Sequence, residues 1–169
     1  APYQNVPMEE MKAIVDNALE NGYSVAWAAD VSEGGFKWKD GVALMPKGKD
    51  QSDMNDTELA RWVKLSDADR LNDKFKFEGP VDEIEVTQES RQEMFDRQET
   101  TDDHGMEIVG TAVDRLGNKY YKVKNSWDDN QKFGGFFYVS MPYFKAKTLD
   151  IYLNKKAVPD DIARKIGIK

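Results

Sequence analysis

The last third of the chain alternates between apolar and polar residues with the period of a β-strand. Within residues 119–127, the side chains expected on one face are Tyr121, Val123 and Asn125. Similar segments predict three more strands, at 106–113, 135–141 and 149–153. The connection 114–118 predicts a hairpin, in which Gly117 and Asn118 suit a positive φ. A sheet of this kind must bury one face, and this need limits the folds open to the chain.

A helix is predicted near the N-terminus, because apolar residues recur at three- and four-residue spacing over residues 8–19. Pro7 suits the first helical position, and Asn21 and Gly22 suit a left-handed cap at the end. The mixture of small and apolar residues at 23–28 predicts a buried strand directly after the helix.

The segment from about 34 to 88 is rich in Asp, Lys, Gly and Asn, and we expect a polar insertion there. Short helices are predicted within 57–65 and at 89–97, and another at 159–166. A single domain spanning residues 1–169 is expected. The fold class predicted from these elements is α+β, with a curled antiparallel sheet or half-barrel, an N-terminal helix and short peripheral helices.

The composition excludes several classes of function. The formal net charge of -7 at pH 7 disfavours binding to nucleic acid, which requires a basic face, and to anionic membranes. No apolar segment approaches the length of a membrane span. The absence of cysteine excludes disulfides and thiolate metal sites. The chain begins at Ala1 without a methionine, so we expect a processed or excised product whose upstream part could have carried an export signal.

His104 is the single histidine of the chain, and Asn125 follows it within the tetrapeptide Lys-Asn-Ser-Trp. A histidine base needs one ring nitrogen free and the other held by an acceptor, which fixes the tautomer and the ring plane. An asparagine oxygen can hold the ring without adding charge. Trp127, two residues beyond Asn125, has the strand parity to cover this hydrogen bond and exclude water from it.

In their order and spacing, these segments resemble the C-terminal half of the bleomycin hydrolase/aminopeptidase C branch of the papain-like cysteine peptidases (peptidase C1B). The most specific motifs are Asp-His-Gly-Met at 103–106 and Lys-Asn-Ser-Trp at 124–127. Further matching segments are 5–8, 20–23, 27–31, 117–123, 134–136 and 143–159. The resemblance implies a papain-like right-hand lobe in which His104 is the general base, Asn125 orients it and Trp127 shields it.

The resemblance also implies a peptide substrate bound near Asp103, Gly105 and Lys169, and no cofactor. In relatives, the C-terminal end of the chain lies in the cleft and restricts cleavage to free amino termini. The catalytic cysteine and the oxyanion-hole glutamine belong to the N-terminal half, so this chain alone is expected to be inactive. Relatives are commonly hexameric, so the resemblance implies a homo-oligomer. Relatives are also commonly cytoplasmic, which is the compartment that the resemblance implies.

An alternative is a degenerate peptidase, a non-catalytic papain-like module that binds peptides or assembles with a partner. A carbohydrate-binding β domain has little support beyond the strands and aromatic residues. A metal site is not expected, although Asp102, Asp103, His104 and Glu107 lie close in sequence, because His104 and Glu107 would point to opposite faces of a strand. Half of a two-lobed enzyme exposes the surface that faced its other half. We therefore expect an apolar patch around His104 and Trp127.

Overall fold

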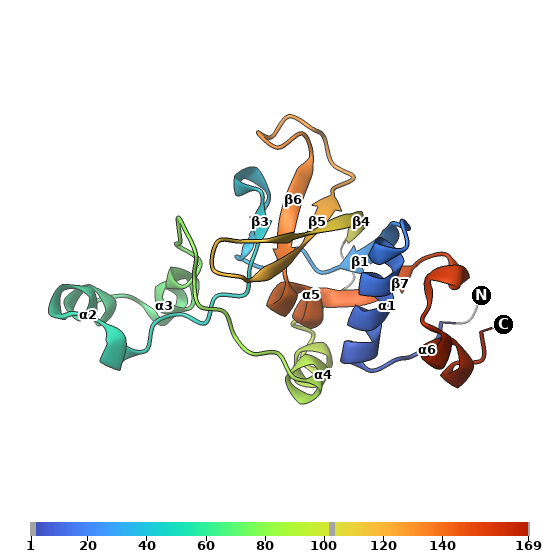
Figure 1. The fold of residues 1–169 in the computed structure, drawn as a ribbon. Coiled ribbons are helices and arrows are strands. Elements are labelled where there is room, and N and C mark those ends of the chain that lie inside the picture. Colours follow the sequence, from blue (N-terminus) through green and yellow to red (C-terminus); the bar gives the residue numbers. More distant parts are fainter. Residues whose placement is uncertain (1–2, 102–103, 169) are drawn as a thin grey trace.

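The structure, a computed structural model, describes residues 3–101 and 104–168 of the chain. Over these residues, the strands form one seven-stranded sheet in the order β2-β3-β6-β5-β4-β1-β7, which curls into a half-barrel (Figure 1). Every neighbouring pair is antiparallel except β3 and β6, which run parallel. The strands are β1 (Val25–Ala29), β2 (Phe36–Lys37), β3 (Val42–Ala43), β4 (His104–Val113), β5 (Lys119–Lys124), β6 (Phe136–Ser140) and β7 (Thr148–Tyr152).

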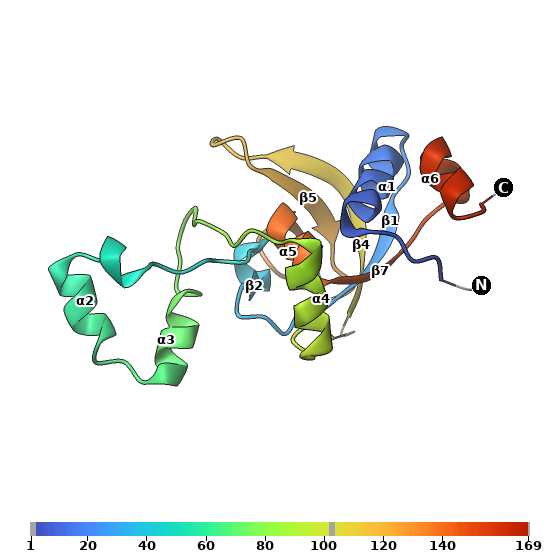
Figure 2. The same cartoon turned by 90° about the horizontal axis from the view of Figure 1, so that it is seen from below.

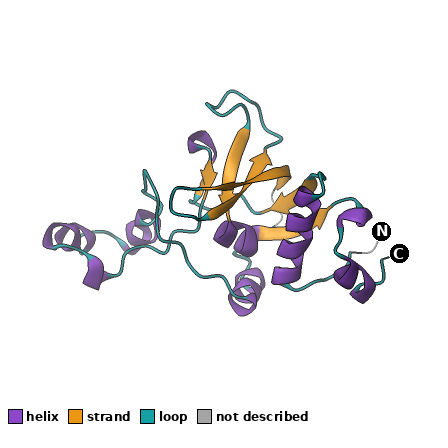
Figure 3. Cartoon of the chain, in the orientation of Figure 1, coloured by secondary structure: helices purple, strands orange, loops and turns teal. Residues whose placement is uncertain are grey.

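Helices lie around this sheet and on an arm that projects from it, as Figure 3 shows. They are α1 (Met8–Glu20), α2 (Asp56–Trp62), α3 (Asp67–Asp73), α4 (Gln88–Asp96), α5 (Met141–Lys147) and α6 (Asp160–Lys165), with 3₁₀ turns η1 (Trp38–Asp40), η2 (Gln51–Asp53) and η3 (Lys155–Ala157). In the described part of the chain, no helix has the length and apolar character needed to cross a membrane. The predicted α+β fold with a curled sheet and an N-terminal helix is confirmed.

The core lies between α1 and the sheet. The buried side chains of α1 are Met8, Met11, Ile14, Val15 and Ala18. They repeat at helical spacing and so form the apolar face expected from the sequence. On the sheet, Tyr121 and Val123 of β5 are buried together with Trp27 of β1. Burying such side chains contributes about 1.5–3 kcal/mol each, so this contact stabilises the fold.

Some local predictions need correction. Strand β5 ends at Lys124, three residues before the predicted end at Trp127. Gly117 has the expected positive φ of 89°, but Asn118 does not. Instead, the side chain of Asn118 donates to the Asp114 carboxylate at 2.9 Å, which closes the hairpin turn. β2, β3, α3 and α5 were not predicted from the sequence.

A helical arm projects from the sheet between residues 48 and 81 and carries α2 and α3. The views in Figures 1 and 2 both place it away from the half-barrel. Its two ends lie side by side, because Lys47 N donates to Asp82 O at 2.8 Å and Ile84 N donates to Met45 O at 3.0 Å. The chain therefore leaves and rejoins the body at one place.

Glu83 fastens this junction to the body. One carboxylate oxygen of Glu83 accepts from Met45 N at 2.7 Å and from the Ser140 hydroxyl at 2.5 Å, immediately before α5. Desolvation of the carboxylate by burial outweighs these hydrogen bonds and raises the pKa of Glu83 above its ordinary value.

The raised pKa gives a prediction for stability. The folded state holds the proton of Glu83 more tightly than the unfolded chain, so this group lowers stability as pH rises from the ordinary pKa of 4.5 to the raised folded pKa. We expect Glu83→Gln to remove this loss, so that the stability of the variant relative to the parent chain rises with pH across this window. Urea unfolding at a series of pH values measures the difference.

Glu58 provides a control of opposite sign. A hydrogen bond from Lys49 lowers the pKa of Glu58, so its contribution to stability is present at higher pH and is lost as pH falls. Glu58→Gln should therefore lose stability relative to the parent chain as pH rises. A parallel pH dependence for the two variants would contradict the assigned role of burial at Glu83.

Candidate active site

His104 and Asn125 are brought together by the adjacent strands β4 and β5. His104 is the first residue of β4 and pairs with Ala29 of β1. Asn125 follows the last residue of β5, and its backbone N–H donates to Gly135 O at 3.0 Å beside the start of β6. Asn125 is only 2% exposed, whereas His104 is half-buried. The backbone of each residue is thus fixed by a neighbouring strand.

A short hydrogen bond joins the two side chains. His104 Nε2 lies 2.6 Å from Asn125 Oδ1. The same oxygen accepts from Trp127 N at 3.2 Å. A backbone N–H can only donate, so this contact fixes which end of the amide faces the ring. Because an amide oxygen only accepts, Nε2 carries the proton, and Nδ1 of the neutral ring is the nitrogen able to accept another proton.

The other end of the amide has no matching partner. Asn125 Nδ2 is buried and has no hydrogen-bond partner among the described residues. A buried unpaired donor costs about 1–3 kcal/mol, so the lobe keeps a polar group here at the expense of stability.

Trp127 covers one side of the imidazole. The centroids of the His104 and Trp127 rings are 4.8 Å apart, with 35° between their planes. Edge contacts to Phe36 and Trp38, each at 5.7 Å between centroids, hold the indole from β2 and η1. The strand-parity argument for Trp127 is wrong, since β5 ends before it. The turn closed by Asn125 Oδ1 and Trp127 N places the indole instead.

Ser126 is a contact that the sequence analysis missed. Its hydroxyl donates to Gly105 O at 3.0 Å and lies 3.3 Å from His104 Nε2. It therefore links the turn after β5 to the two first residues of β4. Its position between Asn125 and Trp127 in the Lys-Asn-Ser-Trp motif could have indicated this contact.

Of the three residues predicted to bind substrate, the structure describes Gly105. Asp103 and Lys169 lie outside the described residues. Gly105 is exposed on β4, pairs with Ala28, and has open space where a Cβ would lie. A shallow hollow of about 680 Å³ adjoins it, lined in part by Ala26, Ala28, Ser126 and Tyr152. Tyr152, which lines this hollow, is 80% exposed, and Trp127, which covers His104, is 44% exposed.

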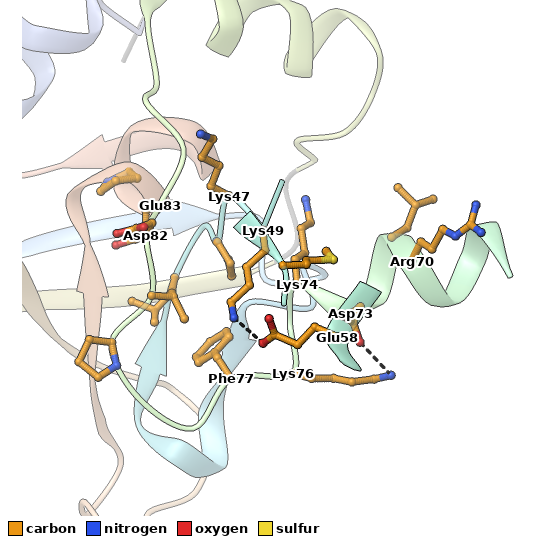
Figure 4. A pocket seen from close by; sticks show the side chains of 18 of the residues that line it. Lys47, Lys49, Glu58, Arg70, Asp73, Lys74, Lys76, Phe77, Asp82 and Glu83 are labelled. Carbon is orange, nitrogen blue, oxygen red and sulfur yellow. Dashed lines mark hydrogen bonds and ion pairs between the residues drawn. The ribbon is translucent and has the colours of Figure 1, made fainter. Parts of the chain in front are cut away.

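A larger hollow of about 1360 Å³ lies between the arm and the body (Figure 4). Its lining includes Leu116, in the turn between β4 and β5, and Lys119, the first residue of β5, both remote from His104. Its charged residues largely pair with one another: Lys49 lies 2.6 Å from Glu58, and Lys76 lies 3.7 Å from Asp73. Among the described residues, no group of three His, Cys, Asp or Glu side chains could hold a metal ion; Asp102 and Asp103 are not among them.

Comparison with known proteins identifies the family. Residues 72–168 match the model of the Peptidase C1-like family, and the chain belongs to that family. The matched region contains His104, Asn125 and Trp127. This result confirms the resemblance to peptidases of the aminopeptidase C type.

Relatives agree along most of the chain. Aminopeptidase C of Lactobacillus delbrueckii subsp. lactis is 26% identical over 162 residues, which cover 95% of this chain and 29% of the relative. Aminopeptidase C of Lactobacillus helveticus is 24% identical, with 95% and 29% covered. Aminopeptidase W of the former organism is 37% identical over 59 residues, 35% of this chain and 14% of the relative. The chain thus spans less than a third of the length of these relatives.

A solved structure shares the fold. The crystal structure of PepW from Lactobacillus rhamnosis superposes with a TM-score of 0.60 at 21% sequence identity. The alignment covers 95% of this chain and 30% of that one. The arrangement of helices and curled sheet is therefore the same as in part of PepW.

Removing the acceptor of His104 tests the geometry of the site. With Asn125→Ala, we expect the neutral imidazole to change from mainly the Nε2–H tautomer to a mixture of both, because the strongest acceptor for Nε2 is lost. Long-range ¹H–¹⁵N correlation spectra measure the tautomer, and a single histidine makes the assignment direct. Asn118→Ala, in the exposed hairpin turn, is the matched control. Unchanged imidazole nitrogen shifts in Asn125→Ala would contradict the hydrogen bond.

Proposed function

We propose that this chain is the C-terminal part of a cysteine aminopeptidase and supplies its histidine base and the asparagine that orients it. The observation that supports this proposal most is the 2.6 Å hydrogen bond between His104 Nε2 and Asn125 Oδ1, covered by Trp127. The chain contains no cysteine, so the nucleophile comes from the N-terminal part of the protein.

The reaction is amide hydrolysis through a thioester. The proton of the cysteine thiol passes to His104 Nδ1, and the thiolate attacks the carbonyl carbon of the first peptide bond. When the tetrahedral intermediate collapses, the carbon–nitrogen bond breaks and Nδ1 gives its proton to the departing amine. Water then attacks the thioester, with Nδ1 accepting its proton, and the thiol is restored when that proton returns to sulfur.

Asn125 suits this chemistry because it is neutral. A carboxylate in its place would stabilise the imidazolium by its own charge and weaken the dependence on the thiolate. An amide fixes the tautomer and leaves thiolate and imidazolium as the charged pair. Cover by Trp127 keeps water from competing for the hydrogen bond, which strengthens it.

Substrate would lie along the exposed side of β4. Gly105 presents open space next to His104, and the hollow lined by Ala26, Ala28 and Tyr152 adjoins it. The proposal that cleavage starts at a free amino terminus draws on the aminopeptidases that the chain resembles, with Asp103 and Lys169 contributing at the substrate end. A non-catalytic module that binds peptides or assembles with a partner is the alternative. The absence of cysteine favours it if this chain is the whole gene product.

Activity measurements on the full gene product test the proposal. With an aminoacyl-coumarin substrate, we expect no turnover by this chain alone and turnover sensitive to thiol reagents when the N-terminal part is present. His104→Gln should then lower kcat about 10²–10⁴-fold, the usual contribution of general acid–base catalysis. Asn118→Ala should leave the rate unchanged.

Two outcomes would overturn this assignment. Turnover that survives His104→Gln would remove the histidine from the mechanism. An upstream coding sequence without a cysteine-bearing papain-like segment would favour the non-catalytic module.

A further inference from the structure

Lys147, the last residue of α5, is a buried cation that binds the segment before His104. Its side chain is 1% exposed. The ammonium forms an ion pair with the Glu33 carboxylate and donates to the backbone carbonyl of Glu99. A buried charge is costly unless it is paired and hydrogen-bonded, and both requirements are met here.

Capping of α5 does not explain this lysine. The guanidinium of Arg91, on α4, already donates to the carbonyls of Lys145 at 2.6 Å and Thr148 at 2.5 Å. The Lys147 ammonium is directed instead to Glu99, outside the helix. The Lys147 ammonium therefore binds the loop that follows α4.

Asp30 is a second buried charge that binds the same loop. It is 1% exposed and directly follows Ala29, the residue of β1 paired with His104. One carboxylate oxygen accepts from Thr101 N at 2.8 Å. The other accepts from Ser32 N, also at 2.8 Å. Asp30 thus connects the end of β1 to the last described residue before the histidine.

Three consecutive residues of the loop are held in this way. Glu99 accepts from Lys147, Thr100 donates through its hydroxyl to Ala146 O at 3.2 Å, and Thr101 donates to Asp30. The two buried charges also belong to one cluster, since Asp30 N donates to Lys147 O at 3.1 Å. The loop is therefore bound to α5 and to β1 at once.

A contribution to folding stability does not explain why Asp30 and Lys147 are charged and buried. Apolar residues of similar volume are often as good as a buried ion pair or better, by about 1–4 kcal/mol. The donors and acceptors converge on residues 99–101, three to five positions before His104 in the sequence. We propose that Asp30 and Lys147 are positioning residues, which hold this loop so that the His104 ring meets Asn125 in the required orientation. This inference rests on the proposed role of His104 as the base.

The state of the single imidazole tests the inference in the chain itself. Asp30→Asn removes the charge and replaces one of the two carboxylate oxygens that accept from Thr101 and Ser32 with an NH₂ group. Lys147→Met keeps the volume but removes every donor. We expect each to reduce the Nε2–H tautomer of His104 toward a mixture. Lys147→Arg, which keeps a cation and donors, should restore the parental spectrum. Wild-type imidazole signals in the folded Asp30→Asn and Lys147→Met variants would overturn the inference.

Matched controls separate positioning from general stability. Lys145→Met removes an exposed ion pair to Glu9, 2.6 Å long, from the same helix. Asp16→Asn alters a carboxylate that accepts from the Tyr121 hydroxyl at 2.6 Å, away from the loop. Both should leave the His104 signals unchanged, and unfolding curves show the cost in stability of each variant.

A milder variant covers the case in which the buried substitutions prevent folding. Glu33 is partly exposed, and Glu33→Gln removes the charge that pairs with Lys147 but keeps an acceptor. We expect a smaller change of the same sign in the tautomer ratio. No change with Glu33→Gln, in a chain where Lys147→Met does not fold, would count against the inference.

The proposed function and this inference fail in different ways. A parent chain without the Nε2–H tautomer would refute the proposed base. A parent chain with that tautomer, unaffected by substitutions at Asp30 and Lys147, would refute positioning alone. In the full gene product, misplacement of the ring should lower kcat by about tenfold to a hundredfold and leave KM nearly unchanged.

Discussion

The hydrogen bond between His104 and Asn125 depends on the register of β4 and β5. Glu107 pairs with Lys124, the last residue of β5, and Asn125 follows directly. A bulge between Ile108 and Gly110 shifts the pairing by one residue relative to the rest of the two strands. Bulges commonly occur beside active sites, where they redirect a side chain. The register at this end of β4 and β5 therefore contributes to bringing Asn125 beside His104.

Apolar contacts and polar contacts have separate tasks in this lobe. The core formed by α1, α5 and the sheet buries apolar surface and stabilises the fold. The buried polar residues lie mainly on the side of His104, and they include Asn125, Asp30 and Lys147. Each is costly to bury, and their hydrogen bonds offset that cost only when the geometry is met. The hydrogen bonds of the buried polar side chains therefore favour one arrangement of the site. The buried apolar side chains stabilise the fold as a whole.

The sequence predicted what is local and missed what depends on distant contacts. Alternation in 119–127 and the motif around Asn125 predicted the strand and the partner of His104. Helix α5 was missed because its short apolar segment follows a strand, and its ends are fixed by Ser140 and by the distant Arg91. Strands β2 and β3 have two residues each, and β3 pairs with the distant β6. The hydrogen bonds that join residues 99–101 to Asp30 and to α5 could not be predicted either, because they do not follow any periodic pattern of apolar residues.

The junction of the helical arm has a consequence for how this lobe can vary among homologous proteins. Residues 47 and 82 are joined by a backbone hydrogen bond, so the intervening segment begins and ends at the same point on the surface. A short turn could span that gap with the sheet intact. Lineages can therefore lengthen, shorten or exchange this appendage while the strands that carry the imidazole stay unaltered, which separates the evolution of outer contacts from that of the chemistry.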